Sequence, residues 1–151
     1  MRFRLVLDAS VALKWYIEEN DTREAIQLKD RIFKEPALVA VPELFFVESA
    51  NVVWKKCALR GELSKIDAQE IFRAVSKLPF QTVPDQEVLS GALRIALKHS
   101  ISVYDAVYLE TAMKLDARFV TADYALVEKL KSSKLSESMI PLKSWNDQFE
   151  T

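Results

Sequence analysis

Four acidic residues of this sequence stand inside apolar runs. They are Asp8 in LVLDASVAL, Glu48 in LFFVESANVVW, Asp105 in ISVYDAVYL and Asp123 in RFVTADYAL. Because a carboxylate is costly to bury without a compensating partner, these positions are candidates for a functional site. By contrast, Asp67 in SKIDAQE and the pair Glu18 and Glu19 in EENDTRE lie among polar residues, and we interpret them as solvated surface.

Converging carboxylates favour metal chemistry. At a separation of ~5 Å each ionised pair would repel by ~3 kcal/mol at an effective dielectric constant of 20. Such groups either share protons, with raised pKa values, or bind a divalent cation, and oxygen ligands suit Mg²⁺ or Mn²⁺. We predict Asp8 and Asp105 as the principal metal ligands, with Asp123 as a further ligand. Glu48 would ligate the ion or orient a water molecule.

Helix capping is the competing interpretation of these acids. Asp123 could cap the helix that follows it, and Asp105 could be the last residue of a capping-box-like SVYD segment. Ser10 could likewise cap the helix after Asp8. Capping explains any one of the three aspartates about as well as a metal site does. It does not explain Glu48, which falls in the second turn of its expected helix.

The counts of cysteine and histidine exclude several other chemistries. Cys57 is the only cysteine and His99 the only histidine. An internal disulfide, a cysteine cluster for zinc and a histidine-rich metal site are therefore excluded. A catalytic triad could use only His99, which stands in LKHSIS near an expected helix end and is interpreted as a surface or capping residue.

Short, nearly continuous apolar runs predict the strands that must position these acids. The expected strands are 3–7, 37–41, 80–83, 118–121 and, more weakly, 139–142. This pattern is typical of strands buried on both faces of a parallel sheet.

Helical patterns lie between the runs. They cover 10–18, 22–33, 42–59, 65–77, 86–98, 103–114 and 124–131. Pro42 suits a first helical position, and Ser64 and Ser102 suit N-caps. Alternating strands and helices imply right-handed crossovers with helices on both sides of an open sheet. We predict a three-layer α/β fold.

This topology would gather the four acids at one edge. In open parallel sheets, ligands bind beyond the carboxyl ends of the strands, near the point where the strand order reverses. Asp8 ends the first expected strand and Glu48 follows the second by two turns or fewer. Asp123 directly follows the fourth, and Asp105 lies in the helix that leads into it.

Length and composition predict an ordinary globular protein. A chain of 151 residues fits one domain, and no apolar run approaches the ~20 residues that cross a bilayer. The apolar stretch of MRFRLVLDAS is too short for a secretory signal, so we expect a cytoplasmic protein. The formal net charge of −1 provides no strong attraction for polyanions, which would depend on local basic patches.

Four segments together resemble the motifs of PIN-domain proteins. They are LDAS (7–10), PELFFVESANVVWK (42–55), SVYDAVYLETAMKL (102–115) and FVTAD (119–123). They stand in the right order over nearly the whole chain, and more narrowly they resemble VapC-like toxins of toxin–antitoxin pairs. The resemblance implies that Asp8, Glu48, Asp105 and Asp123 form the acidic site, with Ser10 and Thr121 as supporting hydroxyls. The sequence departs from the motifs at none of these positions.

The resemblance also implies a fold and an activity. The expected fold is a single PIN-like domain over 1–151, with a parallel sheet of four or five strands. The expected enzyme is an endoribonuclease that uses Mg²⁺ or Mn²⁺ to activate a water for in-line attack on a phosphodiester. A homodimer and a small antitoxin that covers the site are the expected partners. Lys14 and Lys55 are candidates for RNA contacts, with solvated surface as the alternative.

Two other classes of function remain open at this point. A phospho-acceptor receiver domain is also α/β with acids at strand ends, but it requires adjacent acids after the first strand. Here Asp8 is followed by Ala9 and Ser10, which counts against a receiver. A non-catalytic PIN-like module that binds RNA or protein would use the acids only as helix caps, and Glu48 is the residue that this alternative leaves unexplained.

Overall fold

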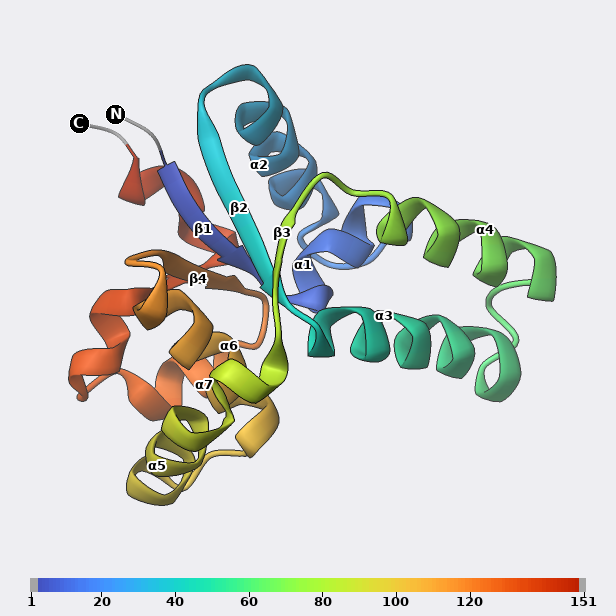
Figure 1. The fold of residues 1–151 in the computed structure, drawn as a ribbon. Coiled ribbons are helices and arrows are strands. Elements are labelled where there is room, and N and C mark those ends of the chain that lie inside the picture. The colour runs from blue at the N-terminus through green and yellow to red at the C-terminus, as the bar shows by residue number, and fades with distance from the viewer. Residues whose placement is uncertain (1–2, 150–151) are drawn as a thin grey trace.

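Five parallel strands form the centre of the computed structural model, which describes residues 3–149. Their order across the sheet is β3-β2-β1-β4-β5 (Figure 1). The strands are β1 (Phe3–Leu7), β2 (Ala37–Pro42), β3 (Gln81–Val83), β4 (Arg118–Thr121) and β5 (Met139–Pro141). The predicted α/β class and the parallel sheet are confirmed, and the weakly predicted last strand is present.

Helices cover both faces of the sheet, as the three-layer prediction requires (Figure 1). They are α1 (Ala9–Ala12), α2 (Thr22–Lys34), α3 (Leu44–Trp54), α4 (Lys65–Ser76), α5 (Leu89–His99), α6 (Val103–Lys114) and α7 (Tyr124–Leu130). The helices α1 and α2 lie on one side and α5, α6 and α7 on the other, while α3 and α4 pack together as a protruding hairpin. No helix within residues 3–149 is long and apolar enough to span a membrane.

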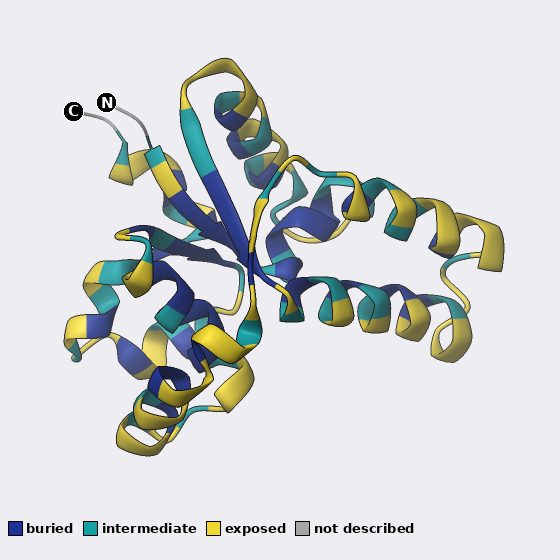
Figure 2. Cartoon of the chain, in the orientation of Figure 1, coloured by how far each residue is buried: buried dark blue, intermediate teal, exposed yellow. Residues whose placement is uncertain are grey.

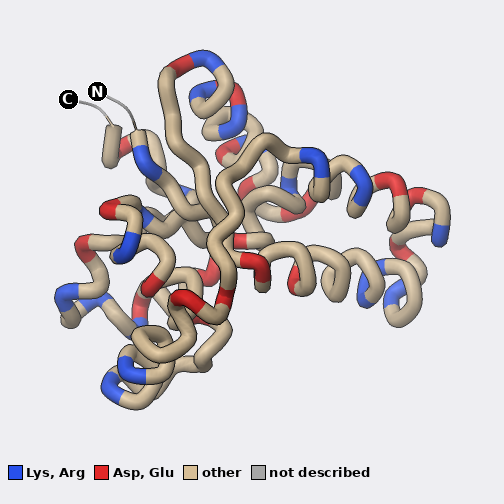
Figure 3. The backbone as a smooth tube through the Cα atoms, viewed as in Figure 1, with Lys and Arg blue, Asp and Glu red and all other residues tan. Residues whose placement is uncertain are grey.

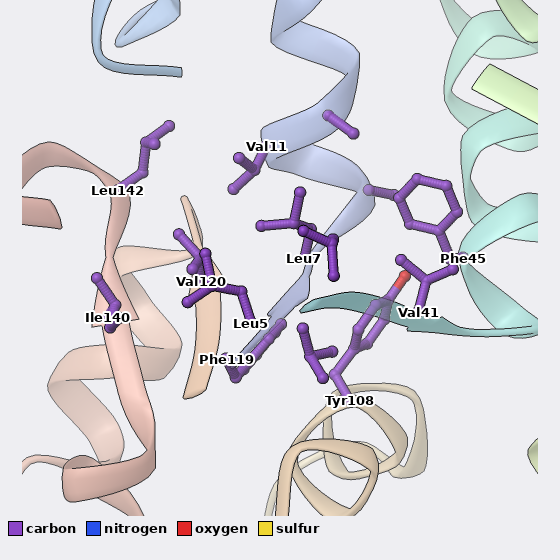
Figure 4. Close-up of a cluster of buried hydrophobic side chains, with 14 of the residues drawn as sticks. Leu5, Leu7, Val11, Val41, Phe45, Tyr108, Phe119, Val120, Ile140 and Leu142 are labelled. Carbon is purple, nitrogen blue, oxygen red and sulfur yellow. The ribbon is translucent and has the colours of Figure 1, made fainter. Parts of the chain in front are cut away.

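The core is built around β1, which pairs with β2 on one side and β4 on the other. Its residues Leu5, Val6 and Leu7 are at most 2% exposed, which explains the continuous apolar run in the sequence. Figure 2 shows that burial is concentrated in the central strands and α1, whereas the far end of the α3–α4 hairpin is exposed. In Figure 4, Val11 of α1 and Tyr108 of α6 approach β1 from opposite faces.

Three of the predicted helices, 10–18, 42–59 and 86–98, differ in the structure by more than a residue at their ends. The helix expected over 10–18 ends at Ala12 and continues as a 3₁₀ turn, Leu13–Trp15, from which the Trp15 indole donates a 2.9 Å hydrogen bond to the Ala25 carbonyl. Pro42 is not the first residue of a helix, because its strand pairing with Val83 extends β2.

The helix that follows β2 has a tertiary cap. The Leu44 amide donates a 3.0 Å hydrogen bond to Asp85 Oδ1, which lies just beyond β3.

The predicted continuation of this helix over 55–59 is a π-helical turn, Lys55–Leu59. The pattern expected over 86–98 divides into a 3₁₀ turn, Asp85–Glu87, and α5.

The helix caps partly follow the sequence prediction. Ser64 and Ser102 accept hydrogen bonds from the amides of Asp67 and Asp105 and cap α4 and α6, as predicted. The cap of α1 is Asp8 itself, not Ser10, since the Ser10 amide donates to Asp8. Two acids of the expected site therefore have capping roles, because Asp123 also caps α7.

Candidate active site

The edge of the sheet beyond β1 and β4 holds an acidic pocket of about 270 Å³. The chain passes from β1 outward to β2 and β3 and then returns to β4 on the other side of β1, so the strand order reverses here. All four predicted acids line the pocket: Asp8, Glu48, Asp105 and Asp123. Figure 3 shows acidic positions gathered where the strands end.

Asp8 is held by two hydrogen bonds. Its Oδ2 accepts from the Thr121 hydroxyl at 2.7 Å and its Oδ1 from the Ser10 amide at 3.3 Å. Burial raises the pKa of Asp8 above its ordinary value, and these hydrogen bonds offset part of the rise because they favour the charged form. The second predicted hydroxyl, Ser10 Oγ, accepts from the Ala122 amide at 3.4 Å.

Glu48 projects from the second turn of α3 and caps no helix. Its Oε1 is buried and makes no hydrogen bond to any described residue, and the same is true of the Tyr108 hydroxyl. Burial raises the pKa of Glu48, and the charges of Asp8 and Asp105 raise it further, while the nearby Tyr108 hydroxyl lowers it. The two unpaired groups are therefore close enough to influence each other.

Asp105 and Asp123 approach the pocket from two further elements. Asp105 lies in the first turn of α6, whose start faces the same edge because the helix precedes β4 and runs back along the sheet. Burial raises the pKa of Asp105, and the charge of Asp123 adds to the rise, whereas the Ser102 hydroxyl lowers it. Asp123 is exposed and follows β4 after one intervening residue.

A fifth carboxylate, Glu19, also lines the pocket, although it is exposed to solvent as we expected. Lys56 lies 3.6 Å from Glu19 and 3.1 Å from Glu62 and is itself only 7% exposed. The sequence carries no signal for this contact, because Glu19 and Lys56 belong to different elements. The sequence analysis also did not identify Tyr108 as a neighbour of Glu48. A signal for it exists, because a tyrosine on an apolar helical face three residues after Asp105 indicates a buried hydroxyl.

Comparison with known proteins agrees with this geometry. Residues 5–130 match the model of the PIN domain. The chain belongs to the PIN-domain family. Ribonuclease VapC3 of Pyrobaculum aerophilum is 32% identical over 133 residues, which cover 83% of this chain and 94% of that protein.

Solved structures share the PIN-domain fold. PAE2754 from Pyrobaculum aerophilum superposes with a TM-score of 0.69 at 23% identity, over 97% of this chain and 88% of that one. A toxin–antitoxin complex from Klebsiella pneumoniae gives a TM-score of 0.60 at 14% identity, over 91% and 97% of the two chains. At these identities the likeness concerns the fold.

The PIN-domain pocket offers a divalent cation only oxygen donors. Among residues 3–149, no three Asp, Glu, His or Cys side chains lie close enough together to hold a metal ion, so at most two of these acids bind one in this arrangement. An open site suits Mg²⁺, which keeps several waters and often binds through one or two carboxylates. Asp8, whose pKa the charge of Asp105 raises, and Asp105 itself fit such a hydrated ion, and the charge of Asp123 acts in turn on Asp105. Glu48 Oε1 is buried without a hydrogen bond and so is free to accept one from a polar group bound in the pocket.

The two predicted RNA-binding lysines lie outside the lining of this PIN-domain pocket. Lys14 is only 8% exposed, so the alternative of solvated surface is wrong for it. Lys55 is exposed and begins the π-helical turn at the end of α3. Contacts of either residue with RNA stay a prediction.

Proposed function

We propose that this PIN-domain chain is a divalent-metal-dependent endoribonuclease and the toxin of a VapBC-type toxin–antitoxin pair. The observation that carries the proposal is the convergence of four carboxylates from four separate segments on one pocket, in a chain 32% identical to a VapC ribonuclease over most of its length. A receiver domain would need a second acid beside Asp8, where the chain has Ala9.

In this proposal each acid has a separate task. Asp8 and Asp105 hold the cation with help from Asp123, and the Thr121 hydroxyl keeps Asp8 charged and oriented. When bound, Mg²⁺ or Mn²⁺ would lower the pKa of a coordinated water and stabilise charge on the phosphate during in-line attack. Glu48 has a raised pKa, which suits a carboxylate that orients the attacking water and accepts its proton.

Two protein partners belong to the proposal. A small antitoxin that covers the pocket would neutralise the clustered carboxylates, and the similarity to a toxin–antitoxin complex supports such a partner. A second copy of the chain fits the leucine stripe of α5, where Leu89, Leu93 and Leu97 follow one another at four-residue spacing and are 43%, 49% and 75% exposed. With RNA as substrate, we place the activity in the cytoplasm.

The competing proposal is a non-catalytic module that binds RNA or protein. It is favoured by the capping roles of Asp8 and Asp123, which give both acids a structural purpose. It does not account for Glu48, which caps nothing and has a buried oxygen without a hydrogen bond.

An RNA cleavage assay with and without Mg²⁺ or Mn²⁺ tests the proposal. The substitutions Asp8→Asn, Glu48→Gln, Asp105→Asn and Asp123→Asn should each slow metal-dependent cleavage by at least about a hundredfold, the usual effect of losing one group that stabilises charge in a transition state. The control Asp67→Asn removes an exposed acid of α4 and should leave the rate unchanged. Cleavage by the Asp105 variant at the parent's rate would disprove the site assignment.

A further inference from the structure

A second, larger pocket of about 470 Å³ lies between α5, α6 and the segment after α7. It shares no lining residue with the acidic pocket. No acidic side chain lines it. Its lining combines the cationic residues Arg94, Lys98 and Lys134 with the apolar residues Ile95, Met113 and Leu135.

No acidic side chain of the described residues pairs with the three cations of this basic pocket. Arg94, Lys98 and Lys134 are exposed, and none forms an ion pair or a side-chain hydrogen bond with any residue of the described part of the chain. Neighbouring lysines behave differently, since Lys114 pairs with Glu87 and Lys131 with Glu128. In a chain of formal net charge −1, positive charge is thus concentrated here.

We propose that the basic pocket binds a nucleotide of the RNA strand at a distance from the cleaved bond. Its phosphate contacts Arg94, Lys98 and Lys134, and its base lies over the apolar floor. This inference rests on the proposed function, which makes RNA the substrate. Without a bound ion, the carboxylates of the acidic pocket repel phosphate, so cations elsewhere on the chain must attract the strand.

The positions of the two pockets allow one strand to reach both. His99 lines the basic pocket and Asp105 lines the acidic pocket, and they are six residues apart. Six residues of chain span at most roughly 20 Å, which a stacked strand covers in about six nucleotides. The turn between them is held by Lys129 Nζ, which donates a 2.5 Å hydrogen bond to the Ser100 carbonyl.

RNA is a better match for this pocket than an acidic protein segment. A phosphate and a base supply, within one nucleotide, both the negative charge that the cations lack and a flat apolar surface for Ile95, Met113 and Leu135. The strand must also be held beside the acidic pocket for cleavage, which requires cations within a few nucleotides.

The test measures binding of a fluorescein-labelled oligouridylate in the presence of a chelator, so that no cleavage occurs. The pocket variant combines Arg94→Gln, Lys98→Gln and Lys134→Gln. The matched control combines Lys34→Gln, Lys65→Gln and Lys77→Gln, which changes net charge equally at exposed lysines outside the pocket. We expect the pocket variant to bind at least about tenfold more weakly, with a slope of log affinity against log salt shallower by about 2, since each phosphate contact contributes ~0.7. The control should stay within about twofold of the parent.

Three results would overturn the inference. The first is unchanged affinity and salt slope in the pocket variant, and the second is an equal loss in the control variant, which would reduce the effect to net charge. The third is loss of a dimer in sedimentation without loss of oligouridylate binding, which would make the pocket an interface between copies. Failure of the proposed function is distinguishable, because it appears as absent metal-dependent cleavage by the parent, whatever the binding result.

Discussion

The Thr121 hydroxyl donates a 2.7 Å hydrogen bond to Asp8 Oδ2, joining residues 113 positions apart. The oxygen of the Thr121 hydroxyl also accepts a 3.0 Å hydrogen bond from the Asp123 amide. One fully buried side chain at the end of β4 therefore positions two of the pocket's acids. Burial alone would favour the protonated form of Asp8, and this hydrogen bond is the largest of those that oppose the rise in its pKa.

Replacing Thr121 with valine should weaken both the fold and the site. Thr121→Val removes a hydrogen bond to a buried carboxylate, which contributes about 2 kcal/mol to the free energy of unfolding. It should also raise the pKa of Asp8 further and weaken Mn²⁺ binding. Urea unfolding in chelator and a Mn²⁺ titration measure the two effects. The control Thr121→Ser keeps the hydroxyl and should retain Mn²⁺ affinity, and an equal loss in both variants would contradict this account.

A bound metal ion should stabilise the folded chain, and loss of an acid should make this stabilisation smaller. An ion that binds only the folded state adds ~2.7 kcal/mol at a hundredfold excess over its Kd. Glu48→Gln should raise the melting temperature in chelator by relieving repulsion and should reduce the gain on adding Mn²⁺. The cap variant Ser64→Ala should instead cost about 1 kcal/mol with or without metal. If Glu48→Gln destabilised the chain equally in both conditions, the site assignment would fail.

Tyr108 should act on Glu48 through its hydroxyl. Its ring stacks on Phe119 with centroids 5.2 Å apart, so Tyr108→Phe keeps the packing and removes only the buried hydroxyl. Because that hydroxyl lowers the pKa of Glu48, the pH profile of cleavage should shift to higher pH. The control Tyr124→Phe removes a 2.6 Å hydrogen bond to Asp21 and should cost about 1 kcal/mol of stability without moving the profile. An unchanged profile in Tyr108→Phe would remove the hydroxyl from the mechanism.

The stability of the metal-free chain should depend on pH through the buried acids. Burial raises the pKa of Asp8, Glu48 and Asp105 above their ordinary values, so the folded chain keeps protons that the unfolded chain loses. Their contribution is therefore fully present below the ordinary carboxyl pKa and is lost as pH rises through the raised values. The stability gained by Asp105→Asn over the parent should be near zero in acid and grow toward neutral pH. Urea unfolding in chelator across this range measures it, and a gain independent of pH would count against a perturbed Asp105.

Local sequence signals predicted much of the fold. The strand at 3–7 and the helix at 103–114 have the predicted bounds, because continuous apolar residues and a serine cap at Ser102 act over a few neighbouring positions. The predicted start of the helix after β2 was wrong. Pro42 belongs to β2 because it pairs with Val83, and the helix begins where Asp85 caps it, and both partners are about forty residues away in the sequence. Contacts of that range leave no periodic pattern in the sequence.

The sequence by itself predicted four of the five acids that line the pocket, because each of the four stands in an apolar run, where a carboxylate is costly to bury. Tertiary structure decided how they are held. The neighbouring positions of β1 and β4 bring Thr121 to Asp8, and the packing of α6 brings Tyr108 to Glu48. Lys56 lies against Glu19, which lines the pocket. These pairings depend on strand order and helix packing, and side chains from distant segments meet only after the sheet has formed.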